Sequence, residues 1–548
     1  MVAEPDFIQQ QFATQKYDVI VIGTGPVGMR FISQFARVNT ESRIAVFGDE
    51  PWMPYNRVNL TSLLTGDIRE EKMYVSFDAA KHANVICYYN NRIMQIDRHA
   101  KVVIDKQGVR HGYDTLVLAT GSSAFMPNIP GINLRNVFSF RDLSDAQKLM
   151  SRIVRSRHTV VIGGGLLGLE AARAMQRFNT NVTVIEHSMW LMFRQLDQRG
   201  GSYLKRHIES LGMNVRTSER VLEILGKDKV QGVLLGNGET IDCDTVVIAA
   251  GIVPNLHLIR HTGLHFGKGI RINDQLQTND SDIYAIGECA EHRKKIYGLV
   301  TPGYEQADVL AYHLNGGKAQ YTGSTATTSL KVLDYPVFSM GEVDLPAQTH
   351  EEIRFQDHQK GIYRRLFLSH GRLRGVVAIG DWPGIERMQD VISRQQRIWP
   401  WHVNKFKKTG ILWAEEDACN VVAWPNSAVI CACMNVTRGN LVLAQRSGVC
   451  NVDQLVEMTG AATACGTCRP LLANFLSMQF TSPADKFTRA IFALSITGLV
   501  VLLLVLYQQT GLSLDGYRGW YALMALGGLV LGGVMLREVI RISSRNGV

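Results

Sequence analysis

Three groups of residues have the types and the spacing of chemically active sites. Two are glycine-rich turns of the pattern GxGxxG, at residues 23–28 and 163–168, and each follows a run rich in Val and Ile. The third is a set of four cysteines: Cys431, Cys433, Cys465 and Cys468. Such turns bind the pyrophosphate of a dinucleotide, and clustered thiolates hold iron–sulfur clusters or zinc. The combination predicts a chain that takes a hydride and passes on electrons.

The first glycine turn has later partners in the sequence that favour FAD as its ligand. An acidic pair follows the next predicted strand, residues 43–47, where a carboxylate accepts hydrogen bonds from a ribose. Residues 116–121 and 279–288 end strands of the kind that return to the same nucleotide in flavoproteins with two dinucleotides. The alternative is a glycine turn in an α/β domain without a ligand. The predicted FAD-binding residues are Gly23, Gly25, Pro26, Gly28, Asp49, Glu50, Ala119, Thr120 and Gly121.

The second glycine turn predicts a nicotinamide nucleotide, with NADH favoured over NADPH. Glu186 ends the next strand, where it would bind the adenosine ribose and repel a 2′-phosphate. His187 and Arg194 leave NADPH open, because a basic side chain nearby can reach a phosphate. Glu170 is predicted to face the junction of flavin and nicotinamide, or else to be only a charge near a helix N-terminus. The predicted NADH-binding residues are Gly163, Gly165, Gly168, Glu186 and Gly251.

Residues 17 to about 390 resemble the FAD- and NAD-binding part of the pyridine nucleotide-disulfide oxidoreductase superfamily, specifically the large subunit of NADH-dependent assimilatory nitrite reductases. The matching stretches are residues 54–62, 163–172, 283–290 and 298–304. The resemblance implies that Arg57 contacts the flavin, that Gly287 and Glu288 bind FAD, and that a helix near Pro302 points its positive end at the isoalloxazine. Arg57 and Glu170 are the predicted catalytic residues.

The four cysteines resemble the bacterioferritin-associated ferredoxin-like module, which holds a [2Fe-2S] cluster. A structural zinc ion is the alternative, because the spacing alone fits both. Disulfide reductases of the superfamily carry a cysteine near the flavin, whereas residues 58–66 contain none. We therefore expect electrons to leave through the four-cysteine module. The other five cysteines are scattered and do not suggest a disulfide framework.

The C-terminal segment predicts a membrane hairpin. Two apolar runs, residues 490–507 and 520–536, approach the roughly 20 residues that a helix needs to cross a bilayer. Lys and Arg flank the outer ends of the pair, which by the positive-inside rule places both ends in the cytoplasm. The net charge of +9 is assigned to the membrane surface, with no nucleic acid as partner. The alternative is a pair of buried core helices.

The predicted fold class is α/β, with two nested Rossmann-like dinucleotide-binding domains, a small α+β domain, a small helical four-Cys iron–sulfur module and a C-terminal two-helix transmembrane hairpin. The FAD-binding domain is predicted to consist of two segments, at 17–147 and 269–323, with the NAD-binding domain between them at 148–268. The other predicted boundaries are the α+β domain at 324–393, a basic and aromatic linker at 394–425, the [2Fe-2S] module at 426–480 and the hairpin at 487–541.

The sequence thus predicts an NADH oxidoreductase tethered to the inner membrane, with its FAD and iron–sulfur domains on the cytoplasmic side. The expected partners are the bilayer, a separate redox acceptor and a second copy in a homodimer. Nitrate or nitrite reductase, a membrane cytochrome and quinone are all compatible acceptors. The alternatives are an NADH:quinone reductase that bypasses the cluster and an FAD-dependent redox sensor or assembly subunit.

Overall fold

A computed structural model describes residues 15–75, 83–178, 180–330, 335–343, 350–382, 385, 387–413, 421–431, 434, 436–463 and 468–479. The first layer is a sheet of order β3-β2-β1-β6-β5-β4, to which β18 is added beside β6. Its strands are β1 (Gln15–Ile22), β2 (Ile44–Phe47), β3 (Val85–Tyr88), β4 (Ile93–Asp97), β5 (Val102–Asp105), β6 (Arg110–Leu118) and β18 (Ile283–Ala285). Because β18 comes from late in the chain, this first domain is built from two separate segments.

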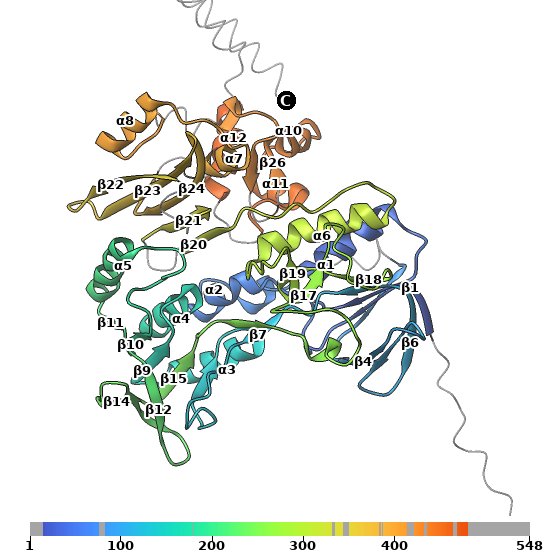
Figure 1. Cartoon of the computed structure of the whole chain (residues 1–548), viewed down its shortest axis with the longest axis horizontal. Helices are drawn as coiled ribbons and strands as arrows, with labels where there is room; N and C mark the ends of the chain where they lie inside the picture. Colours follow the sequence, from blue (N-terminus) through green and yellow to red (C-terminus); the bar gives the residue numbers. More distant parts are fainter. Residues whose placement is uncertain are drawn as a thin grey trace, which may run out of the picture. The chain divides into compact units, whose positions relative to one another are not determined.

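Two helices cover the first sheet side by side, α1 (Pro26–Val38) and α6 (Val300–Leu314) (Figure 1). The central strands β1, β2 and β6 pair in parallel, and β1 and β2 are almost wholly buried after their first residues. Near-continuous apolar strands of this kind are typical of parallel sheets covered on both faces. The carboxyl ends of β1, β2 and β6 therefore meet at one edge, where an α/β sheet binds its ligand.

The second layer repeats this arrangement between the two segments of the first. Its sheet has the order β11-β10-β9-β15-β8, with every pairing parallel. The strands are β8 (Val137–Ser139), β9 (His158–Ile162), β10 (Asn181–Glu186), β11 (Asn214–Thr217) and β15 (Thr245–Ile248), and the helices are α3 (Leu143–Ile153), α4 (Leu166–Gln176) and α5 (Gln198–Ser210). A three-stranded antiparallel unit is inserted before β15: β12 (Val221–Gly226), β13 (Val230–Leu235) and β14 (Thr240–Asp242).

The connections between the two layers pair with each other, since β7 (Ser122–Ala124) runs antiparallel to β16 (Ile252–Pro254). A third, antiparallel sheet of order β20-β21-β24-β23-β22 follows. Its elements are β20 (Thr327–Leu330), β21 (Val337–Gly341), β22 (Glu351–Asp357), β23 (Ile362–Ser369), β24 (Arg372–Ile379) and α7 (Arg387–Ser393). Tyr363 donates a hydrogen bond of 2.6 Å to Asp197, at the start of α5, and so ties this sheet to the second layer.

A section of the predicted linker is an ordered helix, α8 (Pro400–Thr409), whose Phe406 is fully buried in the core of the third sheet. Trp399 and Trp401 stack on each other with ring centroids 5.2 Å apart and are 43% and 61% exposed. They therefore do not pack into the core of the flavin-binding region.

The four-cysteine module has its own core around a short hairpin and three helices: β25 (Val429–Cys431), β26 (Val436–Thr437), α10 (Arg438–Arg446), α11 (Val452–Thr459) and α12 (Arg469–Gln479). Thr437 and Asn440 form a capping box that starts α10. Gly460, at φ +73°, ends α11 in the left-handed conformation that favours glycine. Cys431 and Cys468 are both buried in this core.

The transmembrane hairpin predicted at 487–541 lies outside the described residues, and the described regions of the chain give it no support. The longest helix there is α6, with 15 residues, and no helix in these regions combines the length and apolarity that a bilayer crossing requires. The predicted fold class is corrected accordingly to the α/β layers, the antiparallel sheet and the cysteine module. The predicted inner-membrane location depended on this hairpin and is corrected with it.

Candidate functional site

The first glycine turn joins β1 to α1 and leaves room for a phosphate. Gly23 has φ +129°, and a Cβ there would lie 2.1 Å from the carbonyl oxygen of Ala119. A Cβ on Gly28 would lie 2.1 Å from the carbonyl oxygen of Gly23, so these two glycines allow the helix and strands to pack closely. At Gly25, by contrast, a Cβ would have no atom within 4 Å. Gly25 caps α1 and Pro26 is its first residue, so the open space faces a helix N-terminus, which suits a pyrophosphate.

The second turn, between β9 and α4, has the same geometry. Gly163 has φ +119°, and its Cβ would lie 2.3 Å from the carbonyl oxygen of Ala249, while a Cβ on Gly168 would lie 1.9 Å from that of Gly163. Gly165 again faces open space. The described chain therefore has open space at the N-termini of both α1 and α4, which is what a protein with two dinucleotides requires.

A cavity of about 710 Å³ collects most of the predicted flavin-site residues. From the predicted set it is lined by Gly23, Gly25, Pro26, Asp49, Glu50, Arg57, Ala119, Thr120, Gly121, Glu170, Gly287, Glu288, Cys431 and Cys468. The lining does not include Gly28, Gly163, Gly165, Gly168, Glu186, Gly251 or Pro302. Leu166, Leu167 and Glu170 bring the first turns of α4 to the cavity, so the helix that follows the second glycine turn reaches the predicted flavin site.

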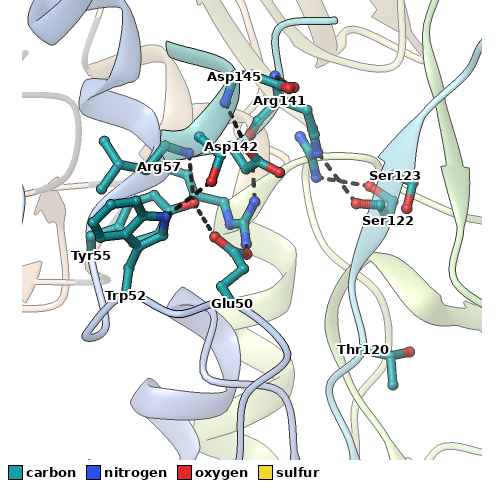
Figure 2. Close-up of polar contacts among 12 residues, drawn as sticks. Glu50, Trp52, Tyr55, Arg57, Thr120, Ser122, Ser123, Arg141, Asp142 and Asp145 are labelled. Carbon is teal, nitrogen blue, oxygen red and sulfur yellow. Dashed lines mark hydrogen bonds and ion pairs between the residues drawn. The ribbon is translucent and has the colours of Figure 1, made fainter. Parts of the chain in front are cut away.

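The two acids after β2 have different surroundings. Figure 2 shows Tyr55 and Arg57 pointing at the Glu50 carboxylate, which accepts a 2.6 Å hydrogen bond from the Tyr55 hydroxyl and pairs with the Arg57 guanidinium. Arg57 lies in a 3₁₀ turn, η1 (Arg57–Asn59). Asp49 has only a loose ion pair of 3.7 Å to Arg92, and its side chain is 63% exposed. The exposed Asp49 carboxylate can thus accept a hydrogen bond from a ribose, whereas the Glu50 carboxylate already binds Tyr55 and Arg57.

Arg141 is a cavity residue that no sequence pattern indicated. Its guanidinium pairs with the predicted FAD residue Glu288 and donates a 2.8 Å hydrogen bond to the Ser122 hydroxyl, which itself donates to Glu288 at 2.7 Å. Arg57 also approaches the Arg141 carbonyl oxygen at 3.5 Å. Because these partners are between 19 and 166 residues apart in sequence, only the folded chain shows that they form one network.

The Glu170 side chain is partly buried at the cavity wall, where the Thr61 hydroxyl is its partner. It lies on α4 and accepts a 2.8 Å hydrogen bond from Thr61, on the short helix α2 (Leu60–Leu64). Burial raises the pKa of Glu170 to about 7, although the Thr61 hydrogen bond opposes the shift. A carboxyl group with this pKa exchanges a proton near neutral pH, which suits a general acid or base.

The raised pKa predicts how stability depends on pH. An unfolded glutamate ionises near pH 4.3, whereas the folded protein keeps Glu170 protonated until about pH 7. The protonated carboxyl group contributes its full stability below the pKa of the unfolded state, and this stability is lost as pH rises through the pKa of the folded state. Glu170→Gln, which stays neutral, should therefore raise the unfolding temperature by several degrees at pH 8 and by much less at pH 5. Calorimetry at both values tests this, and an equal difference at the two pH values would contradict the buried carboxyl.

Glu186 ends β10 as predicted and is 5% exposed. Its two carboxylate oxygens accept hydrogen bonds of 2.7 Å from the backbone N–H groups of Gly164 and Ser188. Since each carboxylate oxygen has two acceptor sites, a ribose hydroxyl can still bind beside these amides. Glu186 also holds the middle of the second glycine turn in place, a structural role that the strand pattern did not reveal.

The predicted cluster ligands are only partly covered by the described residues. Cys433 and Cys465 lie outside them, and accordingly no group of three or more candidate ligands assembles among the residues that are described. Cys431 accepts a 3.4 Å hydrogen bond at its sulfur from the backbone N–H of Ala462. Backbone donors to ligand sulfurs are typical of iron–sulfur sites, where they help set the reduction potential. The donor set therefore fits a cluster of this type.

Three family models match successive regions of the chain. Residues 17–308 match pyridine nucleotide-disulphide oxidoreductase, residues 327–396 the rubredoxin NAD⁺ reductase C-terminal domain, and residues 429–478 the BFD-like [2Fe-2S] binding domain.

Among curated proteins, the chain is 36% identical over 474 residues to a nitrite reductase [NAD(P)H] of Bacillus subtilis, covering 86% of this chain and 58% of that protein. It is 33% identical over 479 residues to an assimilatory nitrate reductase electron transfer subunit of the same organism, covering 86% and 61%. The chain thus spans about three fifths of the length of these relatives.

Among solved structures, a ferredoxin reductase from Rhodopseudomonas palustris is 26% identical with a TM-score of 0.61, and the match covers 66% of this chain and 91% of that one. The expected cofactors FAD, NAD(P)H and a [2Fe-2S] cluster are confirmed by these matches. The chain belongs to the pyridine nucleotide-disulphide oxidoreductase family, as an NAD(P)H-dependent flavin oxidoreductase with a [2Fe-2S] domain.

Proposed function

We propose that this protein takes a hydride from NADH at its FAD and delivers single electrons through its [2Fe-2S] cluster to a separate redox protein. One observation carries the proposal: the cavity at the first glycine turn is also lined by Cys431 and Cys468. Predicted flavin-binding residues and two predicted cluster ligands thus line one cavity.

The cavity wall includes groups that would stabilise the negative charge of a reduced flavin bound there. Glu50 fixes the guanidinium of Arg57, so this charge is held at the cavity wall. Residues 298–301, at the start of α6, also line the cavity. The N-terminus of α6 carries a partial positive charge that stabilises an anion. Pro302 itself is buried in the helix. The residues just before it, 298–301, would therefore face the flavin in its place.

Glu170 provides a proton site at the same wall. Hydride transfer moves one proton with two electrons, whereas a one-electron acceptor takes electrons alone, so a proton must leave at each turnover. The Glu170 carboxyl group, with a pKa of about 7, can accept and release this proton near neutral pH. Thr61 fixes its orientation through the 2.8 Å hydrogen bond.

For the acceptor we infer a nitrate- or nitrite-reducing protein. The support is the similarity to an assimilatory nitrate reductase electron transfer subunit, a protein named for delivering electrons to another component. The similarity to nitrite reductases points to the same class of acceptor.

Anaerobic titration of the purified protein with NADH tests the proposed route. We expect the flavin absorption to bleach and an electron paramagnetic resonance signal of a reduced [2Fe-2S] cluster to appear with the same NADH dependence. Bleaching of the flavin while the cluster stays oxidised, even with excess NADH, would contradict transfer within the chain. Zinc in place of iron and acid-labile sulfide would contradict it as well.

A further inference from the structure

One hydrogen bond joins the flavin-binding region of the chain to the cysteine module. The side-chain amide nitrogen of Asn56 donates to the backbone carbonyl oxygen of Thr463 over 2.7 Å. The two residues are 407 positions apart in sequence. Asn56 directly precedes Arg57, and Thr463 lies five residues before Cys468, so the bond joins the approaches to two predicted cofactor sites.

On the flavin side, Asn56 supports the turn that carries Arg57. Its side-chain oxygen accepts a 3.1 Å hydrogen bond from the Val58 N–H and so caps η1. Its backbone N–H donates to the carbonyl oxygen of Met73 at 2.9 Å. The amide oxygen of Asn56 thus holds the turn that carries Arg57, while its amide nitrogen reaches the cysteine module.

On the module side, Thr463 belongs to a compact turn against a predicted cluster ligand. Its hydroxyl donates a 2.7 Å hydrogen bond to the carbonyl oxygen of Gly460, where α11 ends. The preceding residue, Ala462, donates its N–H to the sulfur of Cys431 at 3.4 Å. The turn 460–463 therefore contacts Asn56 through a carbonyl group and the ligand sulfur through the neighbouring amide.

We infer that Asn56 is a positioning residue, which docks the turn 460–463 against the segment that carries Arg57 and fixes the Ala462 N–H on the Cys431 sulfur. The inference rests on the proposed function, since it assumes that electrons pass from the flavin site to the cysteine module. Docking sets the separation of the two sites, on which the rate of electron transfer depends steeply. The N–H donor to sulfur favours the reduced, more negative cluster and so raises its potential.

Two substitutions separate the two functions of Asn56. Asn56→Asp keeps an oxygen to cap η1 but places a second oxygen against the Thr463 carbonyl group, so the two repel. Asn56→Ser keeps a capping hydroxyl that is too short to reach Thr463. The control is Asn133→Asp, which introduces the same charge at an exposed position of another loop.

The measurements are amide hydrogen exchange at residues 460–463 and the reduction of flavin and cluster by NADH in stopped flow. In both Asn56 variants, we expect the Ala462 amide to exchange at least fivefold faster and the cluster to be reduced at least fivefold more slowly. The reduction potential of the cluster should fall in both Asn56 variants, while their rate of flavin reduction stays unchanged. The Asn133→Asp protein should match the unmodified protein in all of these measurements.

The outcomes distinguish this inference from the proposed function. Unchanged exchange at Ala462 in both Asn56 variants would overturn the positioning role, whatever the electron-transfer rates. If the unmodified protein reduces its flavin but never its cluster, the proposed function fails. In that case faster exchange in the variants still supports docking by Asn56.

Discussion

Replacing Cys431 by serine is expected to lower the reduction of a one-electron protein acceptor at least a hundredfold, while NADH still reduces the flavin at the unmodified rate. A serine hydroxyl is a poor ligand for iron at neutral pH compared with a thiolate. Cys431 is 1% exposed in the module core, and its sulfur receives the Ala462 N–H. The flavin turn at residues 23–28 belongs to another sheet, and its close packing is set by its own glycines.

The measurements for this variant are iron and acid-labile sulfide content, flavin reduction in stopped flow, and turnover with a dye and with a protein acceptor. Cys450→Ser is the matched control, because Cys450 belongs to the same module but is exposed and is not a predicted ligand. The Cys450→Ser protein should retain its iron and its electron transfer to the protein acceptor. A Cys431→Ser protein with full iron content and full protein-acceptor turnover would show that Cys431 is not a ligand.

The features of the site that follow from local backbone requirements could be predicted from the sequence. Glycine is needed at positions 23 and 28 because a Cβ there would collide with a neighbouring carbonyl group. Both positions belong to one six-residue motif, so the sequence pattern indicates them. The position of Glu186 at the end of β10 follows from the same strand–turn–helix pattern. Such features depend on residues near one another in the chain, so a pattern can indicate them.

The contacts that select among similar side chains could not be predicted. Asp49 and Glu50 are neighbours in sequence, and only the folded structure shows that Tyr55 and Arg57 occupy Glu50. Arg141 reaches Glu288 across 147 positions, and Asn56 reaches Thr463 across 407. These pairings depend on how the layers pack, which no local pattern encodes. The predicted membrane hairpin is a different case, because hydropathy alone does not establish a spanning helix and no helix in the described part of the chain is long and apolar enough to cross a bilayer.

NADH is expected to exceed NADPH in kcat/KM by at least tenfold, or about 1.4 kcal/mol in transition-state binding. The reason is the Glu186 carboxylate beside the second glycine turn, where it can accept a ribose hydroxyl but repels a phosphate. His187, whose ring nitrogen lies 2.9 Å from this carboxylate, directs its positive charge toward Glu186 when protonated. This contact reduces the repulsion of a phosphate but leaves the Glu186 carboxylate as the acceptor for a ribose hydroxyl, so we expect NADH to remain preferred.

Glu186→Ala should lower the ratio of kcat/KM for NADH to kcat/KM for NADPH, because it removes the ribose acceptor and the repulsive charge together. It also removes the partner of the Gly164 and Ser188 amides, so both nucleotides should bind less tightly. Glu186→Gln isolates the charge, since its amide oxygen still accepts one of these hydrogen bonds, and its ratio should lie between those of the unmodified and alanine proteins. Glu239→Gln removes an equal charge from an exposed position of the same domain and should leave the ratio unchanged. Equal kcat/KM values for NADH and NADPH in the unmodified protein would refute the role of Glu186, because its charge would then discriminate against nothing.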